Sequence, residues 1–138
     1  MLVCMWRELS TERVLIVDDD EIITVALFRE LDVAGIAADI AVDPGQAREL
    51  LEARDYGVVI VDAYMTGQLH ERAVGLLDTV LTLCGGARVV LVSAYGSTQL
   101  TGRARACDAL TIVTKPVSIV VLAKTVERLL AEIRTRPV

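Results

Sequence analysis

The sequence predicts a doubly wound α/β domain, a five-stranded parallel sheet with helices on both faces, built as (βα)5. Three apolar runs of five residues, each followed by a polar side chain, support this prediction: residues 13–17 (RVLIV), 57–61 (GVVIV) and 88–92 (RVVLV). Near-continuous Val, Ile and Leu runs of this length are typical of parallel strands buried on both faces. The 138 residues are enough for one domain that buries its core without disulfides.

The first run is followed by a helix and a second, weaker strand. Apolar residues recur at helical spacing after the acidic cluster, at Ile23, Leu27 and Leu31. Residues 36–42 are predicted as the second strand, a weak one because alanine is a poor strand former. The next helix begins clearly, because Asp43 can act as N-cap, Pro44 suits the first helical position and Gln46 completes a capping box.

The second half of the chain continues the alternation. A helix is predicted between the third and fourth strands, with Gly85 and Gly86 at its end, and a shorter one at residues 97–107. Residues 110–113 form a weaker fifth strand. The last helix carries one apolar stripe: Ile119, Leu122, Val126, Leu129 and Ile133. We therefore expect an N-terminal extension at residues 1–12, the domain at 13–134 and a tail at 135–138.

Composition and charge exclude several classes of protein. The net charge of −5 argues against binding of a phosphate backbone, so no nucleic-acid partner is predicted. No run approaches the roughly 18 uncharged apolar residues that span a bilayer, so no membrane association is predicted. The three cysteines are widely spaced with no CxxC motif, which favours a reducing, cytoplasmic location.

Reactive side chains follow the predicted strands. The carboxyl ends of parallel strands meet at one edge of the sheet, where ligands bind, and this edge receives Asp18, Asp19, Asp62, Ser93 and Lys115. Two carboxylates about 4 Å apart repel by about 4 kcal/mol at an effective dielectric near 20. Mg²⁺ would relieve this repulsion, because it pairs one or two carboxylates with waters and a phosphate. Stabilisation of a helix N-terminus could account for Asp20 and Glu21, but hardly for Asp62.

The same residues suit formation of an aspartyl phosphate. A carboxylate acts as the nucleophile, and the loose transition state needs mainly position and positive charge. Lys115 and Mg²⁺ would supply the charge, and Ser93 would donate a hydrogen bond to a phosphoryl oxygen.

These motifs resemble the receiver domain of two-component response regulators, from about residue 13 to residue 133. The matching segments are VLIVDDD (14–20), VVIVDAYMTG (58–67), VVLVSAYG (89–96) and VTKPV (113–117). The resemblance implies a flavodoxin-like strand order, 2-1-3-4-5. It also implies a phosphorylation-dependent switch, which is not an enzyme, whose partner is a sensor histidine kinase or a phosphotransfer protein.

The resemblance assigns roles to single residues. Asp62 corresponds to the phosphoacceptor, and Asp18 and Asp19 to the acidic pair, with Asp19 as the direct Mg²⁺ ligand. The backbone carbonyl of Tyr64 would be a further ligand of the metal, together with Asp62. Lys115 corresponds to the family's lysine, and its bond to the following proline would be cis.

The sequence departs from the family pattern at Ile112, where receivers usually carry Tyr or Phe. Isoleucine presents neither a ring nor a phenolic hydroxyl, so its effect on signalling stays open. A phosphate-independent interaction module is the first alternative function. A phosphatase of the haloacid dehalogenase type, with Asp18 as nucleophile, is the second. The cognate kinase, the output partner, the oligomeric state and membership of a longer protein also stay open.

Overall fold

The computed structural model describes residues 12–62, 82, 86–93 and 110–134. The strands are β1 (Val14–Val17), β2 (Ala38–Ala41), β3 (Val58–Asp62), β4 (Arg88–Ser93) and β5 (Leu110–Thr114). The helices with described bounds are α2 (Glu21–Val33), α3 (Pro44–Ala53) and α6 (Ile119–Arg134). The predicted helices between the third and fifth strands lie outside the described residues, except for Thr82, which is helical.

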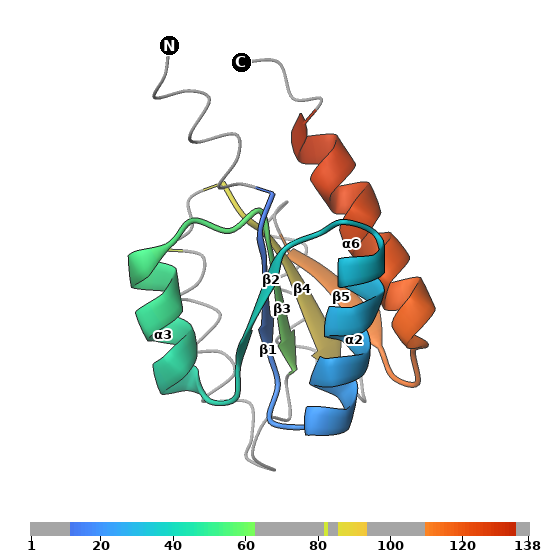
Figure 1. The fold of residues 1–138 in the computed structure, drawn as a ribbon, viewed down its shortest axis with the longest axis horizontal. Coiled ribbons are helices and arrows are strands. Elements are labelled where there is room, and N and C mark those ends of the chain that lie inside the picture. Colours follow the sequence, from blue (N-terminus) through green and yellow to red (C-terminus); the bar gives the residue numbers. More distant parts are fainter. Residues whose placement is uncertain (1–11, 63–81, 83–85, 94–109, 135–138) are drawn as a thin grey trace.

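The five strands form one parallel sheet in the order β2-β1-β3-β4-β5 (Figure 1). This arrangement confirms the predicted fold class and the strand order that the resemblance implied. The boundaries of the extension and the tail remain predictions, because residues 1–11 and 135–138 lie outside the described part of the chain.

Helices cover both faces of the sheet, with α3 on one face and α2 beside α6 on the other (Figure 1). Alternate residues of each strand therefore enter two separate cores. In β1, Leu15 and Val17 join the cluster on the α3 face, whereas Val14 and Ile16 join the cluster under α2 and α6. Burial on both faces explains why β1 and β3 are continuous apolar runs in the sequence. No helix within the described ranges has both the length and the apolar character to cross a membrane.

The helices α2 and α3 both begin with an aspartate cap. The Asp20 carboxylate accepts a hydrogen bond from the Ile22 N–H at 3.0 Å, and Asp43 accepts one from the Gln46 N–H at 2.8 Å. The predicted capping box is only partly correct. The Gln46 side chain accepts from the N–H of Val42, at 3.0 Å, which is one residue before the cap.

The second strand is shorter than predicted because Ile36 belongs to the end of α2. Gly35 adopts a positive φ of 78°, and the N–H groups of Gly35 and Ile36 donate to the carbonyls of Asp32 and Leu31, both at 2.9 Å. This turn directs Ile36 into the core under α2 and α6, and β2 begins only at Ala38. Glycine is required there because the left-handed conformation strains other residues.

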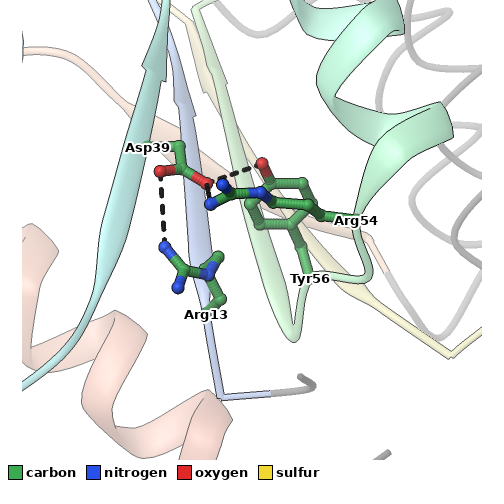
Figure 2. A network of polar contacts seen from close by, with 4 residues as sticks. All are labelled: Arg13, Asp39, Arg54 and Tyr56. Atoms are coloured by element: carbon green, nitrogen blue, oxygen red, sulfur yellow. Dashed lines mark hydrogen bonds and ion pairs between the residues drawn. The ribbon is translucent and has the colours of Figure 1, made fainter. Parts of the chain in front are cut away.

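A polar network ties the edge strand β2 to the segment that follows α3 (Figure 2). Asp39 forms ion pairs with Arg13 at 3.4 Å and Arg54 at 3.2 Å, and it accepts a hydrogen bond from the Tyr56 hydroxyl at 2.8 Å. Burial, with the hydrogen bond and charge of Asp39, raises the pKa of Tyr56 above its usual range. The phenol therefore stays protonated and continues to donate at neutral pH.

Tyr56→Phe is expected to lower the free energy of unfolding by about 1–2 kcal/mol, because it removes a buried hydrogen bond to a charged acceptor. Urea denaturation at neutral pH measures this loss. In a double-mutant cycle, the loss should shrink when Asp39 is already asparagine. An equal loss in both backgrounds would show that the Tyr56–Asp39 contact does not stabilise the fold.

Candidate functional site

Two aspartates lie side by side at the carboxyl ends of adjacent strands. Val17 and Val61 are partners in the register of β1 and β3, so Asp18 and Asp62 come next at the same level. The N–H of Asp18 still donates to the carbonyl of Ala41 at 3.1 Å, which keeps Asp18 in line with the strand. Both side chains are buried, with 6% and 7% of their surface exposed. The predicted juxtaposition of these carboxylates is therefore confirmed.

Lys115 reaches Asp62 from the end of the edge strand β5. It follows β5, which is separated from β3 by β4, and its Nζ lies 3.2 Å from Oδ2 of Asp62. The Lys115–Pro116 peptide bond is cis, as the resemblance implied. Contact between a buried carboxylate and a partly exposed ammonium places one positive charge beside the predicted nucleophile.

Asp18 carries the clearest electrostatic perturbation of the site. Burial is the main reason why its pKa rises from 3.8 to about 6, and the charge and hydrogen bond of Asp62 raise it further. The Asp20 N–H, which donates to Oδ1 of Asp18 at 3.0 Å, and the Lys115 charge oppose this rise. Binding of either a proton or a metal cation therefore stabilises this pair of carboxylates.

The donor set fits Mg²⁺. Within the described ranges no three carboxylate, histidine or cysteine side chains form a metal-binding group. Two carboxylates are nevertheless sufficient, because Mg²⁺ keeps several waters and completes its shell with a phosphate oxygen. Asp19 is exposed, and Tyr64 lies outside the described residues, so their roles as ligands remain predictions.

Ser93 is the last residue of β4, the strand between those that carry Asp62 and Lys115. In the strand register Asp62 is the partner of Val92, and Ser93 is the partner of Thr114. The backbone of Ser93 therefore lies at the same edge of the sheet, one residue beyond the level of Asp62. Its predicted role as a hydrogen-bond donor to the phosphoryl group stays a prediction.

Ile112 lies in β5, partly buried against the core on the α3 face. Its register partner is Leu91 of β4. The aliphatic side chain packs against this core, and nothing in the described residues explains the departure from the aromatic residue of the family.

One feature of the site has no signal in the sequence. A cavity of about 590 Å³ borders Asp18, Asp62 and Lys115 and continues between α2, α6 and the sheet. Its apolar lining includes Leu27 and Leu122, both of which the helical spacing marks as core residues. Periodicity identifies the buried face of a helix but not the distance between that face and its neighbours.

Comparison with known proteins agrees with this geometry. The family model described as the response regulator receiver domain matches residues 14–127. A response regulator receiver domain protein from Methanospirillum hungatei is 24% identical, with a TM-score of 0.75 over 89% of this chain and 96% of that chain. The receiver domain of Francisella response regulator 1452 is 26% identical, with a TM-score of 0.73 over 89% of this chain and 99% of that chain.

A third similar structure is a response regulator from Burkholderia pseudomallei, solved with a phosphorylated aspartic acid, calcium ion and citrate. It is 21% identical, with a TM-score of 0.72 over 89% of this chain and 71% of that chain. No curated protein sequence matches the chain. The likenesses in structure support the fold, and the family model covers most of the sequence. The chain therefore belongs to the response regulator receiver domain family, the aspartate-phosphorylated modules of two-component signalling.

Proposed function

We propose that this receiver accepts one phosphoryl group on Asp62, with Mg²⁺, from a sensor histidine kinase or a phosphotransfer protein. The observation that carries the proposal is the contact of 3.2 Å between Lys115 and the buried carboxylate of Asp62, beside the second carboxylate of Asp18. A nucleophile, a fixed positive charge and a place for a cation are thereby adjacent.

In the proposed reaction a carboxylate oxygen of Asp62 attacks phosphorus, the P–N bond to the donor histidine breaks, and the imidazole leaves. Asp18, Asp19, Asp62 and the Tyr64 carbonyl would hold Mg²⁺, which supplies charge neutralisation for the phosphoryl oxygens. The Lys115 ammonium would exchange its carboxylate partner for a phosphoryl oxygen, the local change that biases a two-state switch. Each molecule accepts one group, so the domain acts as a switch rather than as an enzyme.

Incubation with Mg²⁺ and acetyl phosphate, followed by intact mass and site mapping, tests this function. Wild type should gain one phosphoryl group at Asp62, and Asp62→Asn should gain none. Asp20→Asn is the matched control, because Asp20 is an exposed helix cap and asparagine caps almost equally well. Modification of Asp18 would instead support the phosphatase alternative.

A phosphate-independent interaction module is the second candidate, favoured by the aliphatic Ile112 in place of the family's aromatic residue. Absence of any adduct with acetyl phosphate and with a phosphorylated histidine donor, despite Mg²⁺ binding, would favour this module.

The donor is proposed to dock on the exposed face of α2, which begins beside the site. Ile22 and Val25 lie in the first turns of this helix, with 82% and 46% of their surfaces exposed, and Phe28 extends the apolar face. Exposed apolar groups next to a reactive centre are typical of a protein interaction site. A donor histidine presented by a partner on this face would approach Asp62 from the solvent side of the acidic loop.

Val25→Asp is therefore expected to slow phosphotransfer from a phosphorylated histidine phosphotransfer protein by about tenfold or more. The rate with acetyl phosphate should not change, since that donor needs no protein surface. Val33→Asp, at the far end of the same helix and 86% exposed, is the matched control and should leave both rates unchanged. Equal slowing by both substitutions would argue against docking at the start of α2.

A further inference from the structure

The cavity beside the phosphorylation site has an apolar interior. Ile23 of α2, Val117 and Ile119 of α6 carry half-exposed apolar parts of its lining. Behind them lie nearly fully buried side chains of the strands and helices: Ile16, Ile60, Val92, Leu27 and Leu122. Its volume of about 590 Å³ falls within the range of about 300–1,000 Å³ that is usual for pockets of small molecules. Most of this lining is apolar, so an apolar group that enters and displaces water gains free energy from the surface it buries.

The polar groups that border the cavity carry a net negative charge. Asp18 and Asp62 contribute two carboxylates, and Lys115 contributes one ammonium, which already contacts Asp62 at 3.2 Å. Both carboxylates are more than nine-tenths buried, so water compensates their charges poorly. The charge that complements this end of the cavity is therefore positive.

We propose that this cavity binds a small amphiphilic cation, an alkylammonium or arylalkylammonium compound, with its ammonium group between Asp18 and Asp62 and its apolar chain between α2 and α6. The ammonium group would donate charge-assisted hydrogen bonds to the carboxylates. The chain would gain contacts with the strand and helix side chains that line the interior. Neither half of the cavity alone would select this class of ligand, because the carboxylates also suit a metal ion and the apolar walls also suit an uncharged molecule.

Binding of such a cation would use the carboxylates that the proposed function assigns to Mg²⁺. The two ligands should therefore compete, and an amphiphilic amine would act as a negative regulator of phosphorylation. This regulatory step rests on the proposed function. The binding step does not, since it needs neither metal nor phosphoryl donor.

Titration of the whole chain with n-alkylamines from butylamine to octylamine, in Mg²⁺-free buffer, tests the binding step. The shifts of methyl resonances measured by NMR should saturate and be concentrated at the half-exposed lining residues Ile23, Val117 and Ile119. The Kd should tighten about fourfold for each added methylene until the cavity is filled. Alkanols and alkanoates of equal length are the controls and should bind at least about tenfold more weakly. Equal binding of all three series, or no saturable binding, would overturn the proposal.

A pair of matched variants tests the location of the chain. Leu27→Ala enlarges the cavity, so the tightest-binding amine should become a longer one. Leu31→Ala is the control, because Leu31 lies one turn further along the same buried face of α2 and does not border the cavity. In this variant the preferred length of the amine should stay that of wild type. The same preference in both variants would contradict the proposed position. The comparison of amines, alkanols and alkanoates on wild type remains decisive if a variant fails to fold.

Asp62→Asn tests the position of the ammonium group, and it should weaken octylamine binding by at least about tenfold while leaving octanol binding unchanged. Mg²⁺ should then raise the apparent Kd of octylamine in wild type. Binding of amine without competition by Mg²⁺ would contradict the shared site. Failure of phosphorylation with intact amine binding would contradict only the proposed function.

Discussion

Replacing Lys115 by methionine is expected to slow phosphorylation of Asp62 by acetyl phosphate by about 10²–10³-fold. Lys115 contacts Asp62 directly, at 3.2 Å, and its charge is positioned before any donor arrives. Loss of one preorganised group that stabilises transition-state charge typically costs a factor of this size. Methionine keeps much of the length and apolar volume of lysine, so the change tests the charge rather than the packing.

The measurement is the rate of phosphoryl incorporation at saturating Mg²⁺, followed by intact mass. Lys124→Met is the matched control, because Lys124 is exposed on α6 and its replacement removes the same charge from the chain. We expect the control to react at the wild-type rate. A rate for Lys115→Met within a fewfold of the control would show that the ammonium group does not act on the reacting phosphoryl group.

The sheet could be predicted from the sequence because its strands are buried on both faces. Such burial requires continuous apolar runs, and β1, β3 and β4 consist almost wholly of Val, Ile and Leu. The edge strand β2 was predicted too long. Ile36 looks like a strand residue by type, but the left-handed Gly35 turns it back under α2 as part of the helix end. A buried β-branched residue gives the same sequence signal in either role.

For the site, the sequence was sufficient to predict that Asp18, Asp62 and Lys115 meet at one edge of the sheet. Three consecutive aspartates, however, are indistinguishable by type. The structure separates them by backbone position, since Asp18 continues the line of β1 into the interior and Asp20 caps α2. Asp19, between them, is exposed. The cavity could not be predicted, because its volume depends on the spacing of α2 and α6 above the sheet.

Asp18→Asn is expected to raise the free energy of unfolding of the metal-free protein by about 2–3 kcal/mol at pH 8. Burial raises the pKa of Asp18 from 3.8 to about 6, and each pKa unit corresponds to about 1.4 kcal/mol. The folded state therefore binds this proton more tightly than the unfolded state. The resulting stability is fully present below about pH 4 and is lost as the pH rises through about 6. Asparagine has no charge to bury, so it removes this loss.

Urea denaturation of both proteins from pH 4 to pH 8, without divalent metal, measures the effect. The two stabilities should differ little near pH 4 and separate as the pH rises through 6. Asp19→Asn is the matched control, because that neighbour is exposed, and it should change stability by no more than about 0.5 kcal/mol. Mg²⁺ should stabilise wild type more than Asp18→Asn, since the metal is proposed to bind the charged carboxylate. Parallel pH curves for wild type and Asp18→Asn would show that the buried carboxylate of Asp18 does not destabilise the metal-free protein.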